Sequence, residues 1–517
     1  SNAIIMMKKI FISLTIAGAS LLLSGCNDWL DVVPNNEQVA ADYWKTKEQV
    51  EEVLAQGYSE MRTTVPSLVY WGELRGGSVY AYQDTKMQDL QNFQITASST
   101  LCKWGPFYNV LNVANSVIKY APDVQAIDET YNEAVMNSNL AEAYFMRAWI
   151  YFTLVRNFKE APLILEPYMT DDYAVSVPKS SEERIVAQIK SDIETALSTG
   201  AAKEFYDDDN WSGMTKGRIT KWALYALMAD VCLWSEDYES CVEYADMLIN
   251  STSAYRPAFV EDPTQWFNMY NPGNSNDSIF EINFDEKTYA QTANSPSTVY
   301  PWGISSIAKF QYSKAMCQRL NQEYTHYPAS IRTYLGAFKP SGNSTSVEGY
   351  CIWKFQGSGY MLDGDRGTKD ANWILYRMAD VLLMKAEALI WQGGETNYTT
   401  ALELINKVRT RTQINKLDDD VKSDEERMLK ALLEERDMEL AAEGKRWYDL
   451  VRFGKAKNYK YKTSFIDLIV ANNSSIGSKW LRSVLKDNNA WFLPIHQDEI
   501  DRNPVLTQNP YYDVTAN

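Results

Sequence analysis

Two helix–turn–helix units with the same internal arrangement constrain the fold of this 517-residue chain most strongly. In the first unit, an apolar helix over 223–234 is followed by a short Ser-Glu-Asp break and a second periodic helix. Ala229 lies five residues before Trp234, as Ala386 lies five residues before Trp391 in the second unit. A small alanine where helices approach, with aromatic residues closing the pair, is typical of tetratricopeptide units. The spacing predicts a scaffold of packed helix pairs.

Helical periodicity covers most of residues 38–250 and resumes at about 372. Ser180-x-x-Glu183 has the form of a capping box in front of an apolar stripe. Between about 251 and 370, Gly, Pro, Asn and Ser interrupt short runs and the helical period fades. We expect an all-α, mainly helical fold in which tetratricopeptide-like helix pairs form a scaffold with a loop-rich, irregular C-terminal insert. Loops on a rigid scaffold usually carry the binding residues.

The N-terminal segment has the features of a targeting signal. Residues 1–3 resemble an expression scar, and two lysines then precede an uncharged, mostly apolar run over 10–23. This run is too short to span about 30 Å of hydrocarbon but suits a signal peptide. The Leu-Ser-Gly-Cys sequence ending at Cys26 resembles a bacterial lipobox, in which the cysteine is lipidated; the alternative is an ordinary signal peptide with an incidental cysteine. We expect residues 1–25 to be removed and Cys26 to anchor the protein to a membrane that it does not cross.

Composition excludes several functional classes. The net charge of −17 repels phosphate backbones, so we expect no nucleic-acid partner. The two histidines, His326 and His496, are too few for an HExxH zinc protease or a multi-histidine metal site. No Cys-x-x-Cys pair occurs, and an odd number of cysteines follows Cys26, so buried free thiols are expected. The chain also lacks a Gly-x-Ser-x-Gly nucleophile motif and a Walker loop, and we predict no catalytic residues.

Two acidic stretches begin like calcium-binding loops. They are Asp363-Gly364-Asp365-Arg366-Gly367 and Asp207-Asp208-Asp209-Asn210, and neither has the closing acid that such a loop needs. We interpret both as solvated turns and predict no cofactor and no metal site. Structural calcium is the alternative.

The C-terminal third resembles the SusD/RagB family of nutrient-binding outer-membrane lipoproteins. Shorter earlier blocks agree with it in the family's order, from Leu30-Asp31 through Arg147-Ala148 to Arg377-Met378-Ala379-Asp380. The two blocks that carry the resemblance are Glu434-Glu435-Arg436 continuing to Glu443-Gly444-Lys445-Arg446-Trp447-Tyr448-Asp449, and Phe492-Leu493-Pro494-Ile495 continuing to Gln508-Asn509-Pro510-Tyr511.

The resemblance implies an N-terminal helical region over 26–250 and a C-terminal region over 251–517 that contains the insert. It also implies a surface-exposed protein, lipid-anchored in the outer membrane, that acts as a lid on a SusC-like TonB-dependent transporter. Members of the family capture oligosaccharides, or in some cases peptides, and have no catalytic activity.

Within the second half of the first block, Arg446 and Asp449 are three residues apart and are expected to pair on one helix. Gly444 would allow the backbone to approach a neighbouring element closely. We therefore interpret this charged block as structural.

Loop aromatics are the candidate ligand contacts. A pyranose ring presents a face of C–H groups that stacks on an aromatic ring, while polar neighbours bind its hydroxyls. Tryptophans in helical patterns are assigned to packing instead: Trp104, Trp149, Trp222, Trp234 and Trp447. The glycan-binding candidates are Tyr70, Trp71, Arg75, Tyr80, Tyr82 and Asp84 near the N-terminus, and Trp266, Tyr300, Trp302, Trp353 and Tyr360 in the insert.

The leading hypothesis is therefore a cell-surface protein that binds an oligosaccharide or polysaccharide for import. A peptide-binding RagB-like member is the first alternative. The second is a surface glycoside hydrolase, which would require two carboxylates at catalytic separation.

Overall fold

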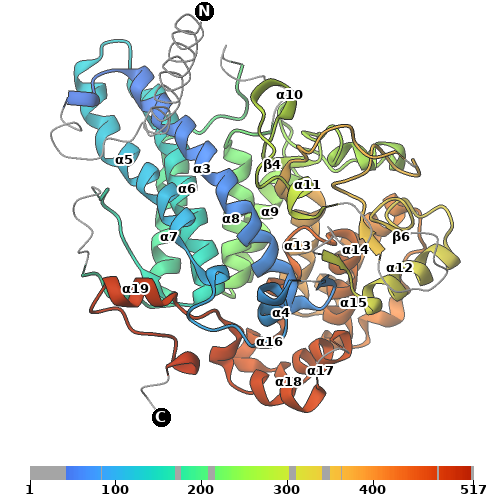
Figure 1. Cartoon of the computed structure of the whole chain (residues 1–517). Helices are drawn as coiled ribbons and strands as arrows, with labels where there is room; N and C mark the ends of the chain where they lie inside the picture. Colours follow the sequence, from blue (N-terminus) through green and yellow to red (C-terminus); the bar gives the residue numbers. More distant parts are fainter. Residues whose placement is uncertain are drawn as a thin grey trace, which may run out of the picture.

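The two predicted helix–turn–helix units pack against each other in the computed structural model (Figure 1). They are α8 (Lys221–Trp234) with α9 (Tyr238–Ile249), and α13 (Met378–Gln392) with α14 (Glu395–Thr412). Helix α13 packs on α9, and the Tyr238 ring stacks on the Trp391 ring at 6.1 Å between centroids. The aromatic residues therefore join one pair to the next, and the predicted scaffold is confirmed.

The structure describes residues 42–82, 84–168, 176–207, 216–301, 310–340, 350–362, 364–473 and 477–513. The signal segment with Cys26, the candidate Trp302, and residues Asp208 to Asn210 and Asp363 of the acidic stretches lie outside these ranges.

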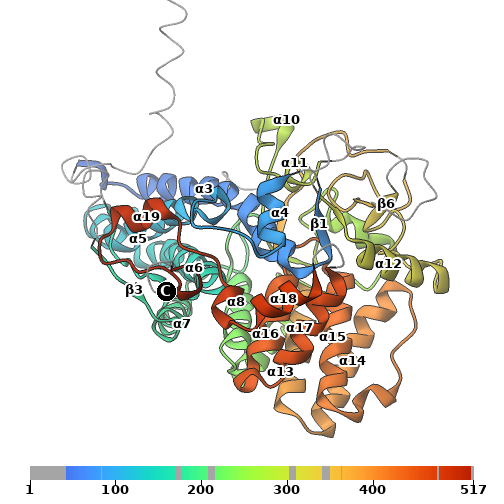
Figure 2. The same ribbon diagram turned by 60° about the horizontal axis from the view of Figure 1, so that its bottom comes forward.

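A second group of helices precedes these two pairs and packs in chain order (Figure 2). Its members are α3 (Lys47–Glu73), α5 (Gly105–Ile127), α6 (Glu133–Phe158) and α7 (Glu182–Ser198). Helix α7 begins one residue later than predicted, because Ser181 caps it by accepting a hydrogen bond from the Arg184 N–H.

The remaining helices lie in the insert and the C-terminal part, apart from α4. They are α4 (Thr85–Gln91), α10 (Glu286–Tyr289), α11 (Pro296–Val299), α12 (Lys314–His326), α15 (Glu425–Glu439), α16 (Arg446–Tyr459), α17 (Lys462–Asn472), α18 (Ser478–Leu485) and α19 (Gln497–Arg502). Short 3-10 turns cover Leu74–Gly76, Thr100–Cys102, Pro263–Met269, Asp419–Ser423, Asn488–Trp491 and Pro510–Tyr512.

Within the described residues, three small antiparallel sheets complete the fold. One pairs β2 (Ala161–Pro162) with β3 (Lys179–Ser180), and a second pairs β4 (Ser278–Ile282) with β8 (Trp373–Arg377). Strand β8 occupies residues predicted to begin the next helix, which starts only at Met378; the buried WILYR run pairs with β4 instead. The third sheet has the order β1-β5-β7-β6, formed by Val79–Ala81, Phe310–Tyr312, Tyr350–Ile352 and Phe338–Pro340.

One hydrophobic core extends from Trp44 to Leu506 and joins the helical scaffold to the insert. The division near residue 250 stays a prediction. The five tryptophans assigned to packing are all buried, and the five cysteines within the described residues are buried and free, as expected.

A close backbone approach ties α3 to the turn before α16. A Cβ atom on Gly72 would lie 2.2 Å from the Gly444 carbonyl oxygen, closer than any real contact. Gly444 itself has φ of +75°, a left-handed conformation that glycine adopts without strain. The predicted role of Gly444 is confirmed. The contact holds the C-terminal end of α3 in place, and the chain continues from there to β1 and the candidate residues Tyr80 and Tyr82.

Candidate functional site

The outward face of the four-stranded sheet carries polar and aromatic side chains. Tyr80 pairs with Gln311 across β1 and β5, so both side chains lie on the same face. Across β6 and β7, Lys339 pairs with Cys351, and the strand register places them on this face as well. Tyr80, Gln311 and Lys339 are partly exposed, whereas Cys351 is buried. We call the surface formed by Tyr80, Gln311 and Lys339 the Tyr80 face.

Two further candidates lie beside the Tyr80 face at the β1 edge, whereas a third, Tyr70, stacks at 5.7 Å on Phe310, whose side chain lies on the opposite face of the sheet. Tyr82 follows β1 and is partly exposed, and Asp84 caps α4 by accepting a hydrogen bond from the Met87 N–H. Burial, with the nearby Asp84 carboxylate as a second cause, raises the pKa of Tyr70 to about 12. Tyr70 and Asp84 thus belong to one local environment beside β1.

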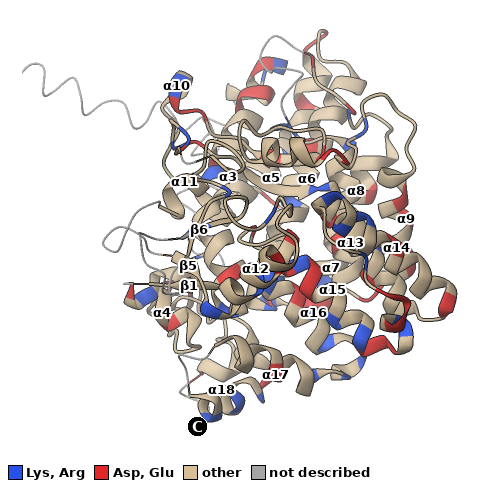
Figure 3. Ribbon diagram, turned by 90° about the vertical axis from the view of Figure 1, so that its right-hand side faces the viewer, with Lys and Arg blue, Asp and Glu red and all other residues tan. Residues whose placement is uncertain are grey.

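This surface carries very little charge. The strand sequences VYA, FQY, FKP and YCI contain Lys339 as their single charged residue. Figure 3 shows the contrast, since acidic and basic residues are concentrated on helices such as α15 and α16, whereas β1 and β5 carry none. An aromatic and amide surface with one lysine, on a chain of net charge −17, suits an uncharged ligand with hydroxyl groups.

Trp71 and Arg75 are core residues, which corrects their prediction as ligand contacts. Helix α3 continues to Glu73, so the Trp71 ring faces inward, stacks on Phe107 and donates a hydrogen bond to the Leu101 carbonyl. The Arg75 guanidinium lies over the Trp447 ring at 4.6 Å and is 2% exposed. Because both side chains are buried in the folded protein, neither can contact a ligand.

Three insert candidates are buried as well, and the prediction that they contact ligand is wrong for this structure. Trp266 packs edge-on against Tyr270, and Tyr300 stacks on Phe355 at 5.6 Å. Trp353 is 0% exposed, with the Lys339 ammonium 4.8 Å from its ring centroid. The Tyr300 hydroxyl also donates a hydrogen bond to the Ala442 carbonyl, which attaches the insert to the C-terminal part, whereas Trp266 and Trp353 pack against other insert residues.

Tyr360 is partly exposed but lies in a different environment. Its hydroxyl donates a hydrogen bond to the Ser330 carbonyl, and burial, with Tyr324 as a second cause, raises its pKa. The structure therefore places Tyr80, Tyr82 and Asp84 together at the β1 end of the sheet, and it adds neither Tyr360 nor Tyr70, which packs on the opposite face.

Gln311 and Lys339 were missed at the sequence level. Both sit in three-residue strands, FQY and FKP, whose partners are distant in the chain. Only the pairing of β1 with β5 and of β6 with β7 assigns them to the same face as Tyr80. The alternation of apolar and polar residues was the available signal, but runs of three are too short to establish a strand.

A buried cluster of ion pairs attaches the insert to the scaffold behind this sheet. The Glu439 carboxylate lies 3.0 Å from Arg377 and 3.3 Å from Arg332, and it also contacts Arg411. The Glu443 carboxylate lies 2.9 Å from Arg377. Arg332 belongs to the insert, Arg377 ends β8 and Arg411 lies in α14, so these two acids join three parts of the chain.

The same cations keep both acids ionised. Burial opposes ionisation of Glu443, but Arg377 and Lys354 outweigh it and lower the pKa to about 2. Burial also opposes ionisation of Glu439, but Arg411, Arg377 and Arg332 hold its pKa well below the ordinary value. Acids bound in this way do not donate protons near neutral pH.

The predicted pair of Arg446 and Asp449 does not form. Arg446 lies 3.6 Å from Asp437, whereas Asp449 contacts Arg436 at 2.9 Å and Arg452 at 2.6 Å. All of these side chains are buried. Asp449 pairs with a tertiary partner, Arg436, and with a different residue of its own helix, Arg452, in place of Arg446. The structural interpretation of the block is unchanged.

Glu73 is a buried acid whose pKa is raised, in contrast to the lowered pKa values of Glu439 and Glu443. Burial raises its pKa to about 8 and Asp437 adds to the effect, while the hydrogen bond from the Gly444 N–H and the charge of Arg446 oppose it. That bond to Oε1 is 2.7 Å long, and Oε2 is buried without a hydrogen-bond partner among the described residues. Because Glu73 is 1% exposed, no substrate can reach it.

Among the residues that the structure describes, no group of three or more His, Cys, Asp or Glu side chains could hold a metal ion. Over the same ranges, no helix has the length and apolar character required to cross a bilayer.

Comparison with known proteins identifies relatives over nearly the whole chain. Residues 281–512 match the model of the SusD family, and residues 28–233 match a family described as starch-binding and associating with the outer membrane. The SusD-like protein P38 of Formosa agariphila is 25% identical over 497 residues, which cover 87% of this chain and 92% of P38. A SusD-like protein of Bacteroides ovatus is 27% identical over 472 residues, covering 85% of this chain and 81% of that protein.

Solved structures show the same fold. A SusD superfamily protein from Bacteroides thetaiotaomicron aligns with a TM-score of 0.72 at 21% identity, covering 91% of this chain and 99% of its own. A laminarin-binding SusD-like protein aligns with a TM-score of 0.65 at 22% identity, covering 90% of this chain and all of its own.

Proposed function

The chain belongs to the SusD family, and from this premise we propose that it binds neutral oligosaccharides on the Tyr80 face. Proteins of this family bind glycans at the outer membrane and are not catalytic. Our proposal adds two points to this family property: the ligand is neutral, and Tyr80 and its neighbours bind it.

The observation that carries the proposal is the combination of aromatic rings and low charge on one face. Tyr80 and Tyr82 offer rings for the C–H face of a sugar, and the Gln311 amide can both donate to and accept from hydroxyls. Lys339 and Asp84 add one charge of each sign at opposite edges of the sheet. A cationic peptide would need an acidic groove, and the strands of this sheet contain no acidic residue. The laminarin-binding relative supports the idea that the fold can hold a neutral glucan.

We further propose that the protein is lipid-anchored through Cys26, exposed on the cell surface, and delivers its ligand to a SusC-like TonB-dependent transporter. The lipobox-like sequence ending at Cys26 and the description of the N-terminal family support this placement. A membrane anchor beside a transporter raises the local concentration of captured ligand.

Replacing both Tyr80 and Tyr82 by alanine is expected to weaken glycan binding about 30-fold, with the thermal stability unchanged. We assign about 1 kcal/mol to each ring, the lower end of the cost of removing an aromatic side chain from a stacked planar ligand. Calorimetric titration of the domain that starts after Cys26 would measure the effect, using laminari-, malto-, xylo- and manno-oligosaccharides.

Tyr255→Ala is the matched control, because Tyr255 is an exposed tyrosine in the segment after α9 and outside the sheet. Equal affinity of the control and the double variant would remove the Tyr80 face from the proposal. Salt-sensitive binding of basic peptides, with no response to any glycan, would select the RagB-like alternative.

A further inference from the structure

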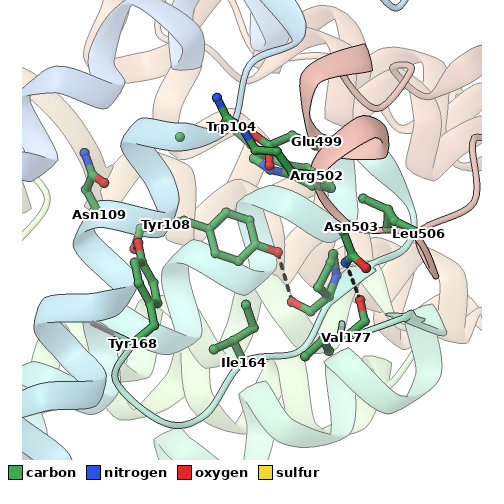
Figure 4. Close-up of a pocket in the computed structure, with 12 residues that line it drawn as sticks. Trp104, Tyr108, Asn109, Ile164, Tyr168, Val177, Glu499, Arg502, Asn503 and Leu506 are labelled. Carbon is green, nitrogen blue, oxygen red and sulfur yellow. Dashed lines mark hydrogen bonds and ion pairs between the residues drawn. The ribbon is translucent and has the colours of Figure 1, made fainter. Parts of the chain in front are cut away.

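A cavity of about 110 Å³ lies at the start of α5, between the segment that follows β2 and helix α19 (Figure 4). Sites that enclose drug-sized ligands occupy roughly 300–1,000 Å³, so this cavity is of a size for a single ring. Figures 1 and 2 both place α19 and α4, which borders the Tyr80 face, apart from each other. The cavity is therefore distinct from the Tyr80 face.

Three aromatic rings in its walls, beside aliphatic residues such as Ile164 and Leu506, are held in fixed orientations. The Tyr108 hydroxyl donates a hydrogen bond of 2.9 Å to the Pro162 carbonyl, and the Tyr168 hydroxyl donates one of 3.2 Å to the Tyr108 carbonyl. Trp104 packs edge-on against Phe158 at 5.1 Å. Because these bonds are made within the protein, the rings need little reordering when a ligand arrives.

The rim of the cavity offers planar polar groups of both kinds. The Glu499 carboxylate and the Arg502 guanidinium lie 3.7 Å apart on α19. The exposed fraction is 28% for the Glu499 side chain and 56% for the Arg502 side chain. Their charges cancel, so the rim presents a hydrogen-bond acceptor and a donor without net charge. Asn109 is exposed on the α5 side of the cavity, across the Tyr108 ring from the α19 pair, and adds an amide (Figure 4).

We propose that this cavity is a second carbohydrate subsite, which takes one neutral pyranose ring. The aromatic walls suit the C–H face of the ring, and the carboxylate, guanidinium and amide suit its hydroxyls. A phosphorylated or carboxylated ligand would meet no net positive charge at this rim. The inference rests on the proposed function, since it assigns the same ligand class to a separate place; two sites on one chain would strengthen capture of a long glycan.

Gly105→Phe tests the subsite with little risk to the fold. Gly105 lines the cavity, an added Cβ atom meets nothing within 4 Å, and its φ lies outside the left-handed region. A phenylalanine there adds a ring beside the cavity, and the space around its Cβ atom is open. Ala126→Phe is the matched control, since Ala126 is an exposed small residue near the other end of the same helix.

The probes are the disaccharides laminaribiose, maltose, cellobiose and xylobiose, which are short enough to report each site independently. Calorimetry of the wild type is expected to show two sites for the disaccharide that binds. In Gly105→Phe, the affinity of one site is expected to fall at least tenfold. In the Tyr80→Ala/Tyr82→Ala variant, the affinity of the other site is expected to fall. The Ala126→Phe control should keep both sites.

The outcomes separate the two proposals. If Gly105→Phe binds as the control does, the second subsite is wrong and the Tyr80 face is unaffected. If Gly105→Phe removes all binding and the tyrosine variant removes none, the subsite stands and the Tyr80 face is wrong. If none of the four disaccharides binds to the wild type, both proposals fail. Should Gly105→Phe not fold, Glu499→Ala/Arg502→Ala replaces it, with an expected loss of about tenfold at the same site.

Discussion

Glu439→Gln is expected to lower the free energy of unfolding by about 3–5 kcal/mol, the range found when one partner of a buried ion pair is removed. Glu439 is fully buried and its carboxylate contacts Arg332, Arg377 and Arg411. A glutamine keeps the shape but removes the charge, and its amide N–H group faces guanidinium donors. Because these arginines come from three parts of the chain, the loss would loosen the attachment of the insert.

Glu434→Gln is the control, since Glu434 is exposed on the same helix and its replacement should cost less than about 0.5 kcal/mol. Urea unfolding, followed by tryptophan fluorescence, compares the two variants. Equal midpoints would show that the cluster does not stabilise the fold.

The second large effect concerns pH and Glu73. Its pKa is raised from 4.5 to about 8 in the folded protein, so the folded state binds a proton that the unfolded chain releases. The stability that this proton contributes is complete below about pH 4.5 and is lost as the pH rises through 8. This rise in pKa corresponds to at most about 5 kcal/mol of the free energy of unfolding.

Glu73→Gln is therefore expected to be more stable than the wild type at pH 9 and close to it at pH 5. A glutamine can still accept the hydrogen bond from the Gly444 N–H through its amide oxygen and cannot ionise beside Asp437. Thermal unfolding at the two pH values measures the difference. The control Glu48→Gln changes an exposed residue of the same helix, so its offset from the wild type should not vary between pH 5 and 9. An equally constant offset for Glu73→Gln would contradict the assignment.

The scaffold could be predicted from the sequence because its signals are local. The spacing of Ala229 to Trp234 and of Ala386 to Trp391 indicates helix pairs. The stacking of Tyr238 on Trp391 joins one pair to the next, and this contact between the units is known from the structure. The boundary of β8 was missed because its apolar run does not distinguish a buried strand from a buried helix segment.

The candidate site was predicted only in part, for a geometric reason. Tyr70 and Trp71 are neighbours on α3, but successive helical residues are about 100° apart, so one ring is partly exposed and the other buried. The insert aromatics face a buried ionic cluster whose two sides are far apart in sequence, Lys354 in the insert and Glu443 after α15. Sequence spacing cannot reveal such a cluster, and the exposed members Gln311 and Lys339 depend on strand pairing.

The central claim is that a neutral glycan lies on the Tyr80 face. A crystal structure of the protein with the oligosaccharide that binds most tightly tests it directly. We expect a sugar ring stacked on Tyr80 or Tyr82, with hydroxyls hydrogen-bonded to Gln311. A bound glycan that leaves Tyr80, Tyr82 and Gln311 without contact would contradict the claim.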